Sequence, residues 1–186
     1  MQTATKRLIT WSVVIILLLL VPLIAMQFNT GVNWGTLDFA VAALLLAGAA
    51  FSYEIIARKG QAASYRIGVG IAVLSSLFLV WANLAVGLIG DESNPANLLY
   101  IGVLLAGFIG AIVSGFRARG LALTLFAMAI VQALIGGIAI VAGLGLPASP
   151  PKEIAGVTGF FVFLFAVAGL MFLRAGVRKK SGDRRN

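Results

Sequence analysis

The stretch WANLAVGLIGDESNPANLLYIGVLLAGFIGAIVSG, residues 81–115, contains the end of one apolar segment, a compact polar turn and the start of a second apolar segment. In its second half, small residues follow one another at intervals of four: Gly102, Ala106, Gly110 and Ser114. On a helix this spacing predicts a stripe of small side chains, along which another helix can approach closely in lipid. The stretch therefore predicts a helical hairpin at the centre of a membrane-embedded bundle.

The composition excludes an ordinary soluble domain. Hydrophobic residues make up 61% of the 186 residues and charged residues only 11%, whereas a soluble domain has about 25% charged residues. Several apolar runs reach the roughly 20 residues that a helix needs to cross the hydrocarbon core of a bilayer. We therefore expect an all-α integral membrane protein.

Polar turns between the apolar segments predict six transmembrane helices in a single transmembrane domain. Their expected bounds are about 8–26, 36–57, 65–89, 95–116, 121–142 and 152–173, followed by a basic cytoplasmic tail over 174–186. Asn94 and Pro95 are expected to be the N-cap and the first residue of the fourth helix. Asp38 lies in the first turn of the second helix, where a carboxylate suits the helix dipole.

The basic residues predict the orientation of the chain. Six spans place both termini on the same side, and with the N-terminus inside, Lys152 is the one basic residue of 14 that lies outside. This distribution follows the positive-inside rule, so we expect a multi-pass protein of the cell inner membrane with both termini in the cytoplasm. The net charge of +8 lies at the ends of apolar segments, so we expect no nucleic-acid partner.

The polar residues inside the predicted spans are the candidate functional residues, because such groups are rare in a bilayer. Glu54 lies near the inner end of the second helix, and Arg58 follows at the spacing of a helix ion pair. This spacing favours an interfacial ion pair over a proton or cation site. Gln132 is the most deeply placed polar group, and a group of this kind most often makes an interhelical hydrogen bond.

Asn83 lies inside the third helix, roughly 10 Å from its outer end. It needs a hydrogen-bond partner there, and we expect one in the turn 91–97 or at Asp38. The adjacent Asn94–Pro95–Ala96 matches the short NPA signature of aquaporin-type channels. Those channels have two such motifs on half-helices that meet at mid-membrane, whereas this chain has one in a connecting turn, so a helix cap is the better explanation.

The stretch WANLAVGLIGDESNPANLLY resembles small multi-spanning bacterial inner-membrane proteins of an uncharacterised family. The similarity extends over roughly residues 33–120, from VNWGTLDF to GFRARG. It supports the expected fold and implies no activity, cofactor or partner.

The chain has neither cysteine nor histidine. This removes thiolate nucleophiles, the usual haem ligand and the commonest zinc ligand. We therefore expect no enzyme, no catalytic residue, no metal site and no protein-ligated cofactor. Binding of a quinone, lipid or pigment at the aromatic outer rim stays open.

Two functions remain. For either function, the expected partners are the lipid bilayer and either other membrane proteins or a second copy of the chain. The first function is a non-catalytic subunit, assembly factor or scaffold of a membrane complex. The small-residue stripe motivates it, as do five phenylalanines of the sixth helix that suit lipid or a partner surface: Phe160, Phe161, Phe163, Phe165 and Phe172. The alternative is a small channel or transporter for an ion or small solute, with Asn83, Asp38, Glu54 and Gln132 as its candidate polar residues.

Overall fold

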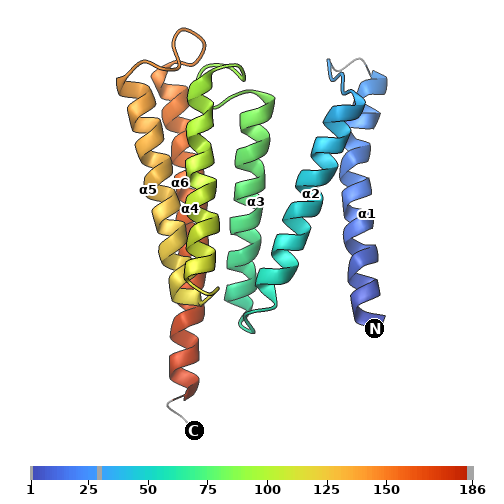
Figure 1. Ribbon diagram of the computed structural model, residues 1–186, viewed down its shortest axis with the longest axis vertical. Coiled ribbons are helices and arrows are strands. Elements are labelled where there is room, and N and C mark those ends of the chain that lie inside the picture. The colour runs from blue at the N-terminus through green and yellow to red at the C-terminus, as the bar shows by residue number, and fades with distance from the viewer. Residues whose placement is uncertain (1, 29–30, 184–186) are drawn as a thin grey trace. The chain divides into compact units, whose positions relative to one another are not determined.

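The computed structural model describes residues 2–28 and 31–183, and in these residues every regular element is a helix (Figure 1). The longer helices are α1 (Gln2–Ala25), α2 (Thr36–Ala57), α3 (Ala63–Ala85), α4 (Tyr100–Val113), α5 (Ala118–Val141) and α6 (Pro151–Asp183), with 3₁₀ helices η1 (Met26–Phe28) and η2 (Pro95–Leu99). Six helical segments of this described part, of 19 to 27 residues each, are long and apolar enough to cross a membrane. The expected all-α membrane architecture is thereby confirmed.

The chain forms two compact units, Met1–Glu54 and Ile55–Asn186. The first unit contains α1, η1 and most of α2. The second contains the last residues of α2 and the four helices α3 to α6. The single transmembrane domain expected from the sequence stays a prediction.

The third helix is shorter than its apolar sequence suggested. It ends at Ala85 instead of Ile89, because Gly87 has a positive φ of 72° and the chain turns there. Pro95–Leu99, expected as the first turn of the fourth helix, is the 3₁₀ helix η2. Asn94 nevertheless caps it as expected, since its side chain accepts a hydrogen bond from the amide of the second helical residue.

The turn after α4 occupies residues 114–117, earlier than expected. Gly115 and Phe116 have positive φ values of 56° and 58°, a left-handed conformation that ends an α-helix. The Phe116 carbonyl accepts a hydrogen bond from the Tyr65 hydroxyl at 2.8 Å, which ties this turn to α3. Because the turn is so compact, α5 already begins at Ala118.

The last helix is longer than expected. α6 continues to Asp183, so most of the expected tail 174–186 has a helical backbone, and its apolar span ends at Val177. Residues 184–186 of the expected tail lie outside the described residues.

In the second unit α6 packs between α3 and α5, and α5 packs between α6 and α4. The interior contains aliphatic side chains from α3, α4, α5 and α6 together with three aromatic rings of α6. Phe161, Phe165 and Phe172 are at most 1% exposed, and the Phe172 ring contacts the Tyr65 ring edge-on at 5.0 Å. The expectation that the α6 phenylalanines face lipid or a partner is therefore wrong for these three, because residues spaced i, i+4, i+11 share one helix face.

Glycines of α4 allow it to approach α5 closely. A Cβ at Gly107 would lie 2.7 Å from the sulfur of Met128, and one at Gly110 would lie 2.5 Å from the Thr124 side chain. A Cβ at Gly102, in contrast, would have no atom of another helix within 4 Å among the described residues. The contact face of α4 therefore only partly coincides with the stripe expected from the sequence.

Helix geometry explains this difference. Residues four apart drift by about 40° around a helix of 3.6 residues per turn, so Gly102 and Ser114 point about 120° apart. The face toward α5 instead follows the i, i+4, i+7, i+11 pattern and contains Val103, Gly107, Gly110 and Ser114, with Ser114 lying against Gly120 of α5. Ala106 lies between the two directions and is half-buried.

We expect Gly110→Ala to destabilise the protein by about 1–3 kcal/mol, because the added methyl group would overpack the α4–α5 contact. Thr124 cannot easily yield, since its hydroxyl donates to the Gly120 carbonyl at 3.0 Å. The matched control Gly102→Ala should be neutral or stabilising by up to ~1 kcal/mol, through helix propensity alone. Thermal unfolding in lipid nanodiscs measures both, and equal effects of the two variants would contradict the packing described.

Candidate functional site

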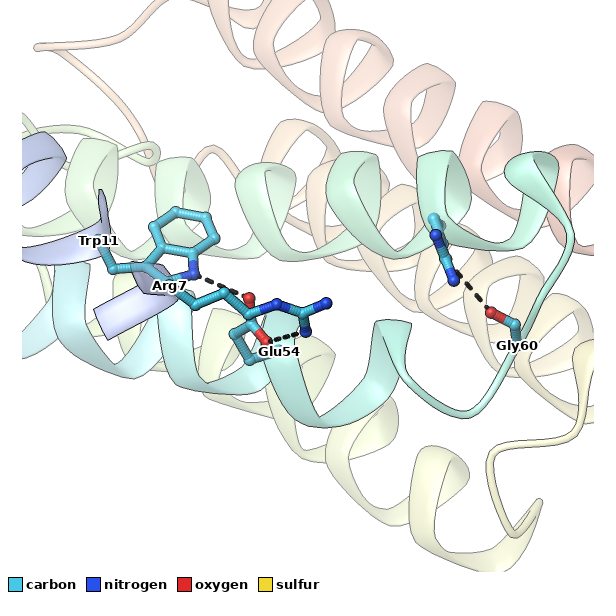
Figure 2. Close-up of polar contacts among 5 residues, drawn as sticks. Arg7, Trp11, Glu54 and Gly60 are labelled. Carbon is cyan, nitrogen blue, oxygen red and sulfur yellow. Dashed lines mark hydrogen bonds and ion pairs between the residues drawn. The ribbon is translucent and has the colours of Figure 1, made fainter. Parts of the chain in front are cut away.

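The first unit contains a polar contact between α1 and α2, which we call the α1–α2 clamp: Arg7, Trp11, Tyr53 and Glu54. Glu54 accepts a hydrogen bond from Trp11 Nε1 at 3.1 Å and pairs with Arg7 Nη1 at 3.2 Å. Figure 2 shows both α1 side chains directed at the carboxylate. The Trp11 ring also packs edge-on against the Tyr53 ring at 5.8 Å between centroids.

The clamp matters because α1 has no core of its own. No side chain of residues 5–25 is buried in the described structure, so α1 presents apolar side chains around its whole circumference. The Arg7 side chain is 55% exposed and that of Glu54 is 20% exposed, which agrees with an ion pair at the end of the span. Glu54 thus has two partners on α1, Arg7 and Trp11. Its pairing with Arg58, expected from their spacing, stays a prediction.

Asp38 serves the start of α2. Its Oδ2 accepts a hydrogen bond from the Gly35 amide at 2.8 Å, and the carboxylate itself is exposed. A side chain at the third helical position that reaches back to the N-cap amide is half of a capping box. Asp38 therefore acts as a helix cap, and it belongs to the same unit as Glu54.

At one end of the second unit, the buried carboxamide of Asn97 holds the loop that follows α3. Its Oδ1 accepts hydrogen bonds from the amides of Leu88 and Ile89, both at 2.9 Å. Its Nδ2 donates to the Asp91 carbonyl at 2.6 Å and to the Ile89 carbonyl at 3.3 Å. One side chain, 6% exposed, thus satisfies four backbone groups of the segment that leaves α3.

Further side chains join this turn to its surroundings. Asn83 of α3 donates to the Asn97 carbonyl at 3.0 Å, which confirms the expected hydrogen bond between Asn83 and the turn 91–97. Asn94 Nδ2 donates to the Leu144 carbonyl at 2.8 Å, and Ser149 donates to the Gly90 carbonyl at 3.0 Å. We call this set of contacts, from residues 86–99 and 142–150, the loop lock; Figure 1 shows the two loops at the same end of the bundle.

Asp91, an exposed residue of the same turn, accepts hydrogen bonds within it. The Ser93 hydroxyl and amide donate to Asp91 Oδ1 at 2.6 and 2.9 Å, and these bonds hold the pKa of the Asp91 carboxyl below its ordinary value. A lowered pKa means that the folded state favours the charged form. The contribution of these bonds to stability is therefore present at neutral pH and is lost as the pH falls through the lowered pKa.

Gln132 lies in the interior of the second unit, on α5. It is 0% exposed, and neither amide atom has a hydrogen-bond partner among the described residues. The interhelical hydrogen bond that its position suggested is therefore not found among the described residues.

The four candidate polar residues are divided between the two units. Asp38 and Glu54 belong to the first unit, and Asn83 and Gln132 belong to the second. Within residues 2–28 and 31–183 no group of three or more acidic, cysteine or histidine residues could hold a metal ion. The arrangement supplies helix caps, one clamp and one loop lock, which are contacts that position helices.

Sequence reasoning missed the central residue of the loop lock. Asn97 entered the sequence predictions only as the last residue of the turn 91–97, and its burial had no signal other than its place two residues after a capped proline. Trp11 and Tyr53 were missed as clamp residues because they lie far from each other in the sequence.

These features define the class of the molecule, an α-helical integral membrane protein with six candidate spans among its described residues. No family model, no curated protein and no solved structure matches the chain.

We expect Asn97→Ala to destabilise the protein by about 2–5 kcal/mol, because the buried amides of Leu88 and Ile89 would lose their acceptor and each unpaired group costs ~1–3 kcal/mol. Asn97→Asp keeps an acceptor but loses both donated bonds, so it should also destabilise. The control Glu92→Ala, at an exposed position of the same turn, should change stability by less than ~0.5 kcal/mol. Denaturant unfolding compares the three, and a harmless Asn97→Ala would refute the loop lock.

For the clamp, we expect Glu54→Gln to cost less than ~1 kcal/mol, since Arg7 is half exposed and the amide oxygen still accepts from Trp11. Glu54→Leu removes both bonds and should cost more. High salt should narrow the difference between wild type and Glu54→Gln. Unfolding with and without 1 M salt, which shortens the Debye length to about 3 Å, tests this prediction. A difference in stability between wild type and Glu54→Gln that does not change with salt would show that the ion pair contributes nothing to stability.

Proposed function

We propose that this chain is a non-catalytic integral membrane protein that serves as a subunit, assembly factor or scaffold of a membrane complex. The observation that carries the proposal is the unburied state of α1. A helix of this length with apolar side chains on all faces must lie against lipid or against other transmembrane helices. Its half-buried side chains, such as Trp11, Ile15 and Leu19, lie on one face, which leaves the exposed faces of α1 for a partner membrane protein.

The second unit supports the proposal by its rigidity. The loop lock fixes one end of the α3–α6 bundle, and the hydrogen bond between Tyr65 and the Phe116 carbonyl fixes a contact at the other end. The Gly60 carbonyl adds a bond from Arg66 Nε at 3.4 Å at that end (Figure 2). A bundle held at both ends suits a structural part better than a moving catalyst.

We also propose the cell inner membrane as the location, with both termini in the cytoplasm. Within the second unit, one end carries Arg58, Lys59, Arg117 and Arg119, whereas Asp91, Glu92 and Glu153 lie at the loop-lock end beside Lys152. The positive-inside rule places the arginine-rich end in the cytoplasm. The resemblance of residues 33–120 to small bacterial inner-membrane proteins supports the same location.

The alternative is a small channel or transporter. One observation favours it, the buried and unpartnered polar atoms near Gln132. The half of the bundle away from the loop lock supports the subunit or scaffold proposal instead, because Phe165, Phe172 and Leu125 fill its interior and are at most 4% exposed. A continuous polar path would have to replace these contacts.

Site-specific photo-crosslinking in native membranes tests the proposal. A photoreactive residue replaces Leu17 on α1, which is 58% exposed, and in a matched control it replaces Phe163 on α6, which is 64% exposed. We expect Leu17 to give an adduct with a different membrane protein, identified by mass spectrometry, in higher yield than Phe163.

Other outcomes would contradict the proposal. Lipid adducts alone at Leu17 would show that α1 has no protein partner. An adduct with a second copy of the chain would indicate a homo-oligomer and favour the channel or transporter.

A further inference from the structure

Four side chains in the α3–α6 unit carry buried polar atoms without a hydrogen-bond partner among the described residues. They are Oδ1 of Asn83, the Tyr100 hydroxyl, Oγ1 of Thr158 and both amide atoms of Gln132. We call them the polar row. Ser64 Oγ shares this property but lies in the first turn of α3, at the other end of the bundle. Native proteins pair nearly all buried polar groups, with bound water where the chain supplies no partner.

The outer part of the polar row begins at the loop lock. The Asn97 carbonyl accepts hydrogen bonds from the Asn83 side chain at 3.0 Å and from the Tyr100 backbone amide. The Tyr100 side chain, 1% exposed, lies close enough to the Thr158 side chain to interact with it. The two hydroxyls lie near each other but outside strict hydrogen-bonding geometry, so each can still take a further hydrogen-bond partner.

The inner part leads from Thr158 to Gln132. The Thr158 side chain lies against Gly136 of α5, where a Cβ would collide with its hydroxyl. Gln132 is one helical turn from Gly136 on the same face of α5. By the helical rise it lies roughly 13 Å from the end of α5, close to the middle of a hydrocarbon core about 30 Å thick.

The polar row ends at Gln132. One turn further along α5 the interior is apolar, with Met128 3% and Leu125 4% exposed. Thr124 carries a hydroxyl there, but it is satisfied by the Gly120 carbonyl. The four side chains of the polar row are therefore confined to the half of the bundle next to the loop lock, and Ser64 at the opposite end is separate from them.

The chemistry of the polar row defines its occupant. Its groups are two carboxamides and two hydroxyls, which are neutral and both donate and accept hydrogen bonds. We propose that the polar row is a hydration site, at which water molecules enter from the loop-lock end, bridge Tyr100, Thr158 and Gln132, and stop at mid-membrane. A buried water makes about three hydrogen bonds to groups of this kind. The proposal goes beyond the scaffold function and does not rest on it.

Radiolytic hydroxyl-radical labelling of the full-length protein in lipid nanodiscs tests the hydration site, because radicals formed from bound water label the side chains beside it. Tyr100 and Phe172 are aromatic and both 1% exposed, so bulk solvent would label them equally once each rate is divided by the intrinsic reactivity of its ring. We expect Tyr100 to be labelled several-fold faster than Phe172. Equal rates would overturn the proposal, whatever the crosslinking of α1 shows.

Variants identify the groups that hold the water. Thr158→Val and Gln132→Leu should each lower the Tyr100 labelling rate several-fold. The matched control is Ser75→Ala, since Ser75 is 3% exposed but its hydroxyl already donates to the Ile71 carbonyl at 2.7 Å; this variant should leave the rate unchanged. Unchanged labelling in both polar-row variants would contradict the assignment. If either variant fails to fold, the comparison of Tyr100 with Phe172 in the wild type still tests whether the hydration site exists.

Discussion

The α3–α6 bundle depends on the carboxamide of Asn97, which satisfies backbone groups where the chain leaves a helix in an apolar setting. The amides of Leu88 and Ile89 have no helical partner because α3 has already ended. In a bilayer such groups must find partners within the protein, and Asn97 supplies an acceptor for both. An asparagine is suited to this role because one planar side chain presents acceptor and donors together.

The loop lock determines how the helices can pack. With the α3–η2 segment tied to the α5–α6 loop through Asn94 and Ser149, α6 lies between α3 and α5 instead of at the edge of the bundle. Its buried phenylalanines then contribute the large aromatic rings of the interior, and glycines of α4 bring that helix close to α5. In the described part of the first unit, the buried residues are Ala42 and Ala50, and the clamp joins α1 to α2 through Glu54.

Much of this fold follows from hydrophobicity and charge. The bounds of α2 were predicted from the sequence alone, because Asp38 and the polar residues after Ala57 mark its ends clearly. The ends of α3 and α4 were not predicted, since Leu88 and Ile89 are as apolar as any helical residue and the turn at Phe116 uses a non-glycine residue with positive φ. Only tertiary hydrogen bonds decide such ends.

The contacts of the candidate residues were likewise predicted only in part. The spacing of Asn83 and the turn 91–97 predicted their hydrogen bond, because a polar group at that depth has few partners within reach. The partners of Glu54 on α1 and the lack of a partner for Gln132 were not predictable, since both depend on which helix faces which. Helix periodicity assigns a residue to a face but does not identify the neighbour of that face.

Amide hydrogen exchange at Leu88 and Ile89, measured by NMR on the protein in nanodiscs, tests the role of Asn97 most directly. These amides lie outside every helix, so without the carboxamide they would exchange like those of an open loop. The account predicts protection comparable to that of amides within α3, and much slower exchange than at the exposed Glu92. Exchange at Leu88 and Ile89 as fast as at Glu92 would contradict it.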